Sequence, residues 1–436
     1  MSQYLNDLMD FLDGSYSPFH SVTSARRRLD AAGFTALEEC AAWTLEPGKC
    51  YYTTRNQSSI IAFKVPETQL TGWRMSAAHS DSPTYRVKMD AQPDKNSSGL
   101  RRLWVEGYGG MIAGSWMDRP LTVAGRVLVE DAGSIQARLV YLDRDLLAIP
   151  SLAIHMDRTI NKERELNPKR DMQPIFGGEN ASSLTSLLAA ELGVEESQIL
   201  GADLTLCPRQ KAVLIGAEQE LIHSPRLDDL ECAWGTLTGF LESRPAEGIA
   251  AVWCMFDNEE VGSGTRQGAM SSFLPDVMDR VEAVFGLSTE QHHAALASSI
   301  LMSADNAHAI HPNYADKSDP VAPVKVNGGI VLKYNASQKY TTTALSGAVF
   351  TSLCKQAGVP VQVYTNRADM PGGSTLGNLL SAQVSIPMMD VGLGQLAMHS
   401  CVETAGAKDP EYLLKAAQVF YAADLRCTGD GCYTLK

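Results

Sequence analysis

The chain has 436 residues, of which 44% are hydrophobic and 20% charged, and its formal net charge is −13. These values indicate one large or two unequal globular domains and exclude a strongly basic surface of the kind that binds nucleic acid. The sequence contains no run of about 18 apolar residues, the length that a membrane-spanning helix needs. The N-terminal stretch lacks the basic start and apolar run of a signal peptide. The nine cysteines include no Cys-x-x-Cys pair, which is typical of reduced thiols, so we expect a cytoplasmic protein.

The first 90 residues predict two helices followed by strands. A helix over 2–13 has Ser2 as its N-cap, and a second helix covers 19–32 and stops at a glycine. The following strands are predicted at 50–54, 59–65 and 73–78.

Between about 90 and 222 the pattern changes. The turn-rich linker AQPDKNSSG is followed by LTVAGRVLVED and SIQARLVYLD, which alternate as antiparallel strands do, and SSLTSLLAAEL then predicts a helix. We therefore predict a β-rich domain at 91–222, inserted into a larger domain made of 1–90 and 223–436. Such an insertion is tolerated because the entropy cost of closing a loop grows slowly with its length.

From about residue 224 onward, helices and strands alternate. In chain order, the pattern predicts a helix over 227–243, a strand over 249–256, a helix over 277–286, strands over 298–304 and 328–334, a helix over 341–358, a strand over 359–365, a helix over 374–383, a strand over 386–392, and a helix over 409–425 with Asp409 as its cap. This alternation predicts an α/β fold with a mostly parallel central sheet flanked by helices.

Polar side chains follow several of these strands. In open α/β sheets, ligands bind beyond the carboxyl ends of the strands. The residues at these ends and in the loop before the helix at 227 are His79, Asp81, Asp228, Asp229, Glu259, Glu260, Asp305, His308, His311 and His399. Imidazole and carboxylate ligands without thiolate suit zinc, cobalt or manganese.

Each feature by itself has an ordinary explanation. Adjacent glutamates usually form a solvated surface, Asp228 and Asp229 can cap a helix, and a lone histidine such as His399 is more often structural. Their common position at one end of the predicted sheet favours a binuclear metal site. In such a site one carboxylate bridges the metals. One of the adjacent glutamates then binds a metal while the other acts as a general base.

Seven motifs together resemble the aspartyl aminopeptidases, a family of cytosolic dinuclear zinc peptidases that remove acidic residues from peptide N-termini. The motifs are AAHSDSPTYRVK, GGMIAGSWMDRPLTVAGRV, IPSLAIHMDRTIN, SPRLDDL, DNEEVGS, SADNAHAIHPNY and QLAMHS. The resemblance implies two Zn²⁺ per subunit, with Co²⁺ or Mn²⁺ as possible substitutes. It also implies that a water activated by the two metals hydrolyses the peptide bond.

The resemblance also implies a role for each matching residue. His79 and Asp305 would bind one zinc, Glu260 and His399 the other, and Asp228 would bridge the two. Glu259 would be the general base, and Asp81 would orient His79.

The same resemblance implies an assembly. Family members form dodecamers built from dimers, and their inserted β-rich domain mediates dimerisation. His155 would then reach the active site of a neighbouring subunit. Taken without the resemblance, His155 is more often a structural histidine than a catalytic one.

An acidic substrate needs local hydrogen-bond donors, since the chain itself is acidic. The candidates are Lys333, Tyr340 and Arg367, although each charged side chain could equally be solvated. The sequence GGST at 372–375 departs from the Cys-Gly-Thr pattern expected there, which leaves specificity less well defined than chemistry. Two alternatives remain open: a co-catalytic zinc aminopeptidase, carboxypeptidase or deacylase of other specificity, and a non-catalytic cage-forming assembly protein.

Overall fold

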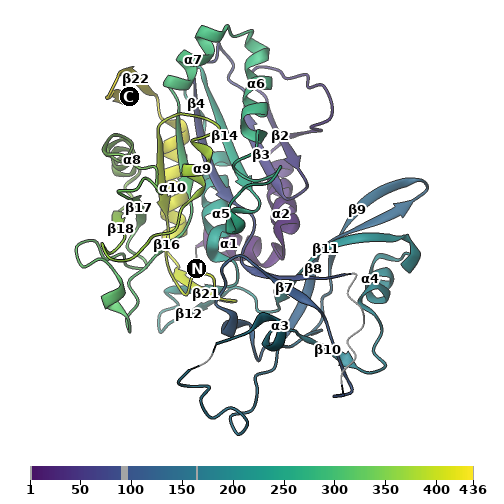
Figure 1. Cartoon of the computed structure of the whole chain (residues 1–436). Helices are drawn as coiled ribbons and strands as arrows, with labels where there is room; N and C mark the ends of the chain where they lie inside the picture. Colours follow the sequence, from purple (N-terminus) through teal and green to yellow (C-terminus); the bar gives the residue numbers. More distant parts are fainter. Residues whose placement is uncertain (1, 90–96, 164, 436) are drawn as a thin grey trace.

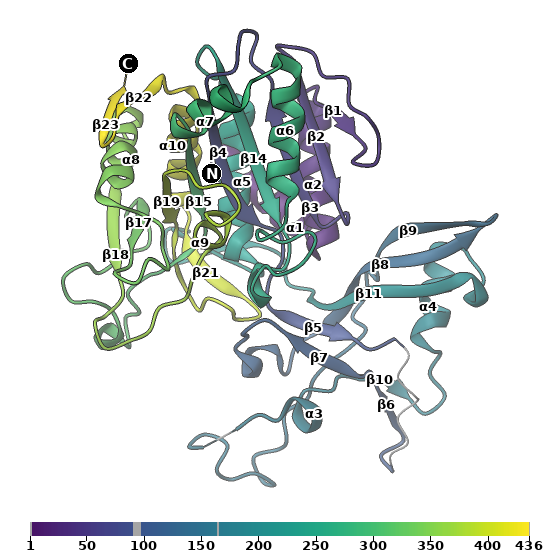
Figure 2. The same ribbon diagram turned by 45° about the horizontal axis from the view of Figure 1, so that its top comes forward.

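The computed structural model describes residues 2–89, 97–163 and 165–435. The chain folds into a larger part, built on a nine-stranded sheet, and a smaller part, built on a five-stranded sheet, which lie side by side (Figures 1 and 2). Most of the predicted linker, residues 91–96, lies outside the described residues. None of the described helices combines the length and the apolar character that crossing a membrane requires.

The nine-stranded sheet forms the centre of the larger part. Across the sheet its strands are β1 (Thr35–Leu37), β2 (Cys50–Arg55), β3 (Ser59–Lys64), β14 (Ile249–Phe256), β4 (Gly72–His79), β15 (Ile300–Ala304), β19 (Met388–Gly392), β17 (Ile330–Tyr334) and β18 (Val361–Thr365). The central strands β14, β4, β15 and β19 are parallel. Antiparallel pairs join β2 to β3, β3 to β14 and β19 to β17. The prediction of a mostly parallel sheet is thus confirmed at the centre, where every residue of β4 and β14 is buried.

Helices cover both faces of this sheet, which explains the continuous apolar runs of its central strands. On one face lie α1 (Gln3–Gly14), α2 (Pro18–Ala31), α5 (Leu227–Glu242), α8 (Ala344–Ala357) and α10 (Asp409–Ala422). On the other face lie α6 (Phe273–Phe285), α7 (Thr289–Ala297) and α9 (Leu376–Leu380). The predicted α/β fold class is confirmed.

One predicted helix cap is confirmed and one is wrong. The Ser2 side chain accepts a hydrogen bond from the backbone N–H of Leu5 at 3.2 Å, as an N-cap does. Asp409 lies inside the first turn of α10 instead of capping it. Its carboxylate accepts hydrogen bonds from the backbone N–H groups of Asn327 and Gly329 in the adjacent loop, and the helix has no side-chain cap.

The smaller part contains the five-stranded sheet β7 (Val105–Tyr108), β5 (Thr84–Val87), β11 (Ile199–Pro208), β8 (Leu121–Asp131) and β9 (Ser134–Tyr141). Beside it are the pair β10 (Ile175–Gly178) and β6 (Leu100–Arg102), and the helices α3 (Pro168–Asp171) and α4 (Leu184–Leu192). A separate sheet of the larger part consists of β12 (Val213–Ile215), β13 (Leu221–Ser224), β21 (Glu403–Gly406), β20 (Gly394–Leu396) and β16 (Ala307–His308). A terminal hairpin pairs β22 (Leu425–Gly429) with β23 (Cys432–Leu435).

Strand pairing gives the limits of the inserted sheet. Its first strand begins at Thr84 and its last ends at Pro208, so it begins and ends before the predicted limits of 91 and 222. The strands β12 and β13 pair instead toward β21 of the larger part.

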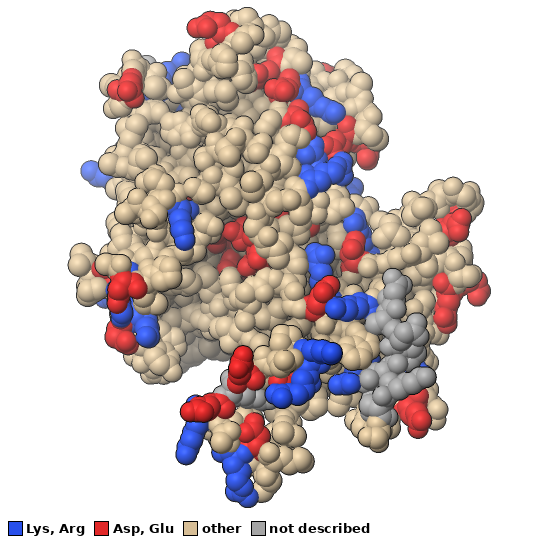
Figure 3. Space-filling view, viewed as in Figure 1, with Lys and Arg blue, Asp and Glu red and all other residues tan. Residues whose placement is uncertain are grey.

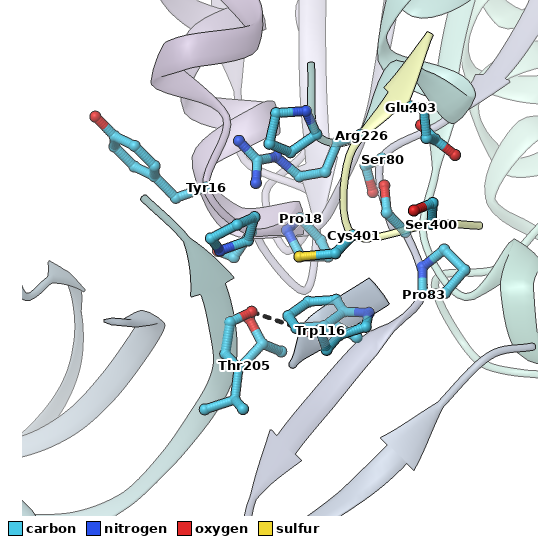
Figure 4. Close-up of a pocket in the computed structure, with 16 residues that line it drawn as sticks. Tyr16, Pro18, Ser80, Pro83, Trp116, Thr205, Arg226, Ser400, Cys401 and Glu403 are labelled. Atoms are coloured by element: carbon cyan, nitrogen blue, oxygen red, sulfur yellow. Dashed lines mark hydrogen bonds between the residues drawn. The ribbon is translucent and has the colours of Figure 1, made fainter. Parts of the chain in front are cut away.

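The two parts are packed closely where β8 and β9 meet the N-terminal helices. Tyr16 stacks on Tyr141 with ring centroids 3.7 Å apart. Arg126 lies 4.4 Å from the ring centroid of Phe19 and donates a hydrogen bond to the backbone oxygen of Asn56. A cavity of about 30 Å³ also lies at this junction (Figure 4). Its walls include Trp116 and Thr205 of the smaller part and Pro18, Arg226 and Glu403 of the larger part.

Candidate metal centre and active site

The carboxyl ends of the central strands bring the predicted site residues together. His79 is the last residue of β4 and pairs with Phe256, the last residue of β14. Glu259 and Glu260 follow β14 in a single 3-10 turn, Glu259–Val261, and Asp305 directly follows β15. Because these parallel strands end at the same edge of the sheet, residues more than 200 positions apart become neighbours.

Three overlapping groups of side chains have potential ligand atoms that all lie within 4.8 Å of one another. The groups are His79 with Asp228, Asp229 and Asp305; His79 with Glu259 and Glu260; and Asp228 with Glu260 and His399. They contain all five residues predicted as metal ligands, together with the predicted base.

Asp228 lies between the two histidines. Its Oδ1 is 3.3 Å from Nε2 of His79, and its Oδ2 is 3.5 Å from Nε2 of His399. The same His399 nitrogen lies 3.4 Å from Oε2 of Glu260. Each oxygen of Asp228 therefore faces a different histidine, an arrangement that suits a carboxylate shared by two cations.

The backbone around these predicted ligands is held by Glu403, which is buried on β21. Its two carboxylate oxygens accept hydrogen bonds from the N–H of His399 at 2.7 Å and from the N–H of Asp228 at 3.0 Å. Glu403 was not predicted, because nothing in its local sequence distinguishes it from another strand residue. Asp229 was noted only beside Asp228; its Oδ2 accepts a hydrogen bond from the backbone N–H of His79.

Asp81 makes contacts that differ in detail from those expected. The closer partner of Nδ1 of His79 is the backbone oxygen of Asp81, at 3.0 Å, whereas its carboxylate oxygen Oδ1 lies 3.6 Å away. The Asp81 carboxylate accepts hydrogen bonds from the backbone N–H groups of Glu259 and Glu260, both at 3.1 Å. Asp81 thus fixes the turn that carries both glutamates.

Opposing effects set the protonation of the two histidines. Burial alone would lower the pKa of His79, but the adjacent carboxylates of Asp228 and Asp81 raise that pKa well above its usual range. Burial disfavours the charged form of His399, but the carboxylates of Asp228 and Glu260 favour it more strongly. Together these effects raise the pKa of His399 to about 10. Burial would also raise the pKa of Asp228, but the neighbouring imidazoles of His399 and His79 lower it.

Too little positive charge lies near the remaining carboxylates to keep them ionised at their usual pKa. Burial, with neighbouring carboxylates, raises the pKa of Glu260 and Asp229 well above the usual range and that of Glu259 to about 8. Among the described residues, Asp228 Oδ1, Asp229 Oδ1 and Glu260 Oε1 are buried without a hydrogen-bond partner. A divalent cation would neutralise this group and satisfy these oxygens. The donor set, with imidazole and carboxylate but no thiolate, fits zinc.

The predicted substrate-binding residues occupy different environments. The Lys333 ammonium is buried and donates to the backbone oxygens of Asp305 and Asn306 at 2.7 and 3.3 Å. It lies 5.3 Å from the ring centroid of the buried Tyr340. Arg367 is ion-paired with Asp369 through its Nε and Nη2 atoms. Lys333 and Tyr340 therefore adjoin Asp305, a predicted metal ligand, whereas most donors of Arg367 are already engaged.

His155 lies apart from this cluster in the exposed segment 151–163 of the smaller part, and it belongs to none of the three ligand groups. Its neighbours Leu152, Ile154 and Met156 are also exposed.

Comparison with known proteins identifies the family. The profile described as Aminopeptidase I zinc metalloprotease (M18) matches residues 11–421. The chain belongs to the M18 family of zinc aminopeptidases. This membership confirms the predicted enzyme class and the resemblance, and favours an aminopeptidase over a carboxypeptidase, a deacylase or a non-catalytic cage.

Individual M18 relatives support this assignment over nearly the whole chain. The chain is 40% identical over 428 residues to a probable M18 family aminopeptidase 2 of Clostridium novyi, covering 96% of this chain and 98% of the relative. A chain in the structure of the Ape4 and Nbr1 complex is 36% identical, with a TM-score of 0.92, covering 96% of this chain and 85% of that one. A chain in the structure of the S. cerevisiae mApe1 dodecamer is 26% identical to this chain, with a TM-score of 0.85, and the match covers 96% of each chain.

Proposed function

We propose that this M18 aminopeptidase releases N-terminal Asp or Glu from peptides, using two zinc ions, or Co²⁺ or Mn²⁺ in their place, with Glu259 as general base. The observation that carries the two-metal proposal is the position of Asp228, whose two oxygens each face a different histidine at 3.3 and 3.5 Å. His79 and Asp305 would hold one ion, and Glu260 and His399 the other. Bound zinc ions would supply Lewis-acid chemistry, polarising the scissile carbonyl and stabilising negative charge on its oxygen.

Glu259 is the proposed proton carrier of the reaction. Its backbone N–H is fixed by Asp81 at 3.1 Å, which places the side chain beside the ligand cluster. Burial raises the pKa of Glu259, which makes its carboxylate a stronger proton acceptor. Glu259 would take a proton from the attacking water and deliver it to the amine of the leaving peptide.

The acidic preference rests on hydrogen-bond donors near this cluster, namely the cations Lys333 and Arg367 and the phenol of Tyr340. Lys333 and Tyr340 lie next to Asp305, and Arg367 lines both of two neighbouring clefts of about 290 and 910 Å³, the smaller of which also includes His308. Lys and Arg side chains, interspersed with Asp and Glu, also lie on the smaller part, below a hollow that contains carboxylates (Figure 3). Local cations of this kind outweigh the net charge of the chain, because remote charges are screened within about 10 Å at physiological salt.

A panel of aminoacyl chromogenic substrates tests this proposal. Asp, Glu, Leu and Ala derivatives would be compared with and without added zinc, cobalt and manganese. We expect kcat/KM to be highest for Asp or Glu and to require metal. Equal or faster release of Leu or Ala would refute the acidic preference, while leaving the aminopeptidase assignment intact.

We also propose that the chain forms homo-oligomers, as a dodecamer built from dimers, through its inserted part at 84–208. The likeness to the S. cerevisiae mApe1 dodecamer supports this, as do the exposed apolar residues Leu152, Ile154 and Met156 around His155. In such an assembly, His155 would reach the neighbouring active site and help to stabilise the oxyanion. Native mass spectrometry checks the assembly, and a monomer at micromolar concentration would refute it. A cytoplasmic location belongs to the same proposal, and all nine cysteines are free thiols.

A further inference from the structure

A short segment of the inserted part runs directly along the candidate metal centre. This segment, Tyr108–Ile112 (sequence YGGMI), connects the end of β7 to the 3-10 turn Ala113–Trp116, and we call it the strap. Its residues contact Asp81, Glu260 and His399, which belong to three separate segments of the larger part. The strap is thus the place where the smaller part meets the catalytic groups.

Tyr108 completes the hydrogen bonding of Asp81. The Tyr108 hydroxyl donates to Oδ2 of Asp81 at 2.7 Å and accepts from Nδ2 of Asn258 at 2.9 Å. The same Asp81 carboxylate accepts the backbone N–H groups of Glu259 and Glu260. With three donors on two oxygens, the carboxylate has one well-defined orientation, so the hydroxyl fixes the turn that carries both glutamates.

Gly109 allows the strap to approach the turn closely. Its φ is +75°, and a Cβ atom at this position would lie 3.1 Å from Cβ of Glu260 and 3.3 Å from Cα of Pro83. Any larger residue would therefore press on the side chain of Glu260, the proposed zinc ligand.

Gly110 and Ile112 hold His399 from the other side. The backbone oxygen of Gly110 lies 2.7 Å from Nδ1 of His399, and the N–H of Ile112 donates to the backbone oxygen of His399 at 2.9 Å. Since a carbonyl can only accept, Nδ1 carries the proton and Nε2 is directed to Asp228 and Glu260. A backbone contact of this kind fixes the tautomer that a metal-binding histidine needs.

We propose that the strap is a positioning element of the active site, so that the inserted part takes part in catalysis within its own chain, in addition to any role in assembly. Tyr108 is a positioning residue that acts through Asp81 on the Glu259–Glu260 turn. Gly109 and Gly110 position the two ligands of one zinc ion. This inference rests on the proposed roles of Glu259, Glu260 and His399.

The first experiment removes one hydroxyl group. Tyr108→Phe should lower kcat by about 10- to 100-fold, the usual cost of losing a partner of a metal-site group, while KM changes less than about twofold and bound zinc is retained. Tyr85→Phe is the matched control: Tyr85 is buried on the adjacent strand β5, where it packs edge-on against Trp116. An unchanged kcat for Tyr108→Phe, or an equal loss in both variants, would overturn the role of Tyr108.

The second experiment measures zinc affinity and does not depend on turnover. Gly109→Ala should weaken zinc binding by about 10- to 100-fold in a chelator competition. Gly133→Ala is its control, since Gly133 has a similar φ of +83° but a Cβ atom there would meet nothing within 4 Å. Equal zinc affinity of the two variants would overturn the proposed contact with Glu260.

These outcomes are separable from a failure of the proposed function. If Glu259→Gln kept full activity, the general base would be misassigned. The zinc affinities of Gly109→Ala and Gly133→Ala would still decide whether the strap positions the metal ligands.

Discussion

Buried carboxylates occur in two contrasting environments in this protein. Asp390 on β19 accepts hydrogen bonds from the backbone N–H and the hydroxyl of Thr341 and from the hydroxyl of Thr375. Asp409 on α10 accepts two backbone N–H groups of the neighbouring loop. In the candidate metal centre, by contrast, buried oxygens of Asp228, Asp229 and Glu260 have no hydrogen-bond partner among the described residues.

The difference separates two uses of the same chemical group. A buried carboxylate saturated with N–H and O–H donors is satisfied by the protein itself and holds loops in place. A cluster of carboxylates that face one another remains costly until a cation is bound. The following predictions test this distinction, beginning with the largest expected effect.

Glu259→Gln should reduce kcat by about 10³-fold, within the range that a general base contributes, and should leave zinc bound, because Glu259 is not a proposed ligand. Activity assays of the purified variant measure kcat, and elemental analysis measures its bound zinc. Glu260→Gln is the companion variant and should lose zinc as well as activity. If Glu259→Gln lost its zinc while Glu260→Gln kept it, the roles of the two glutamates would be reversed.

Asp228→Asn should weaken zinc binding by more than about 100-fold, since changes to groups that only support a metal ligand already cost 10- to 100-fold. Asp390→Asn is matched to it as a change of a fully buried carboxylate. This second variant should retain zinc and lose about 1–3 kcal/mol of unfolding free energy, because its threonine donors lose an acceptor. A similar zinc loss in both variants would remove the distinction between the two environments.

Removal of zinc by a chelator should destabilise the wild-type protein. At a free zinc concentration of 100 times Kd, binding adds about 2.7 kcal/mol to the unfolding free energy. Differential scanning calorimetry with and without chelator measures this difference. Asp228→Asn should respond far less, and an equal response of the two proteins would place the stabilising ion elsewhere.

Asp409 predicts a smaller, pH-dependent effect. Burial outweighs the two amide donors and raises the pKa of Asp409 to about 7. Because the folded pKa exceeds the unfolded value of about 4, the stability contributed by this group is present below pH 4 and is lost as the pH rises to about 7. Asp409→Asn cannot ionise, so its stability relative to wild type should improve by about 2.5 kcal/mol between pH 5 and pH 8. Urea denaturation at the two pH values measures this change, and a constant difference would contradict the raised pKa.

The principal elements of the larger part could be predicted because their patterns are local. The apolar run at β14 and the alternating helices and strands after residue 224 were sufficient for the fold class. The helix cap at Ser2 was also readable, whereas Asp409 was misassigned because its donors come from a loop some 80 residues away in the chain. From the predicted parallel order of the central strands, we could expect His79, Glu260 and Asp305 to be neighbours.

The sequence by itself determined the chemistry of the site, since imidazole and carboxylate groups at the ends of parallel strands are bound to meet at one edge of the sheet. Only the tertiary structure decided how those groups are held. Glu403 supports Asp228 from 175 positions away, and the strap supports His399 from 289 positions away at Gly110. Such contacts leave no local pattern, because a backbone oxygen or N–H is present at almost every residue and only the fold selects which one faces the site.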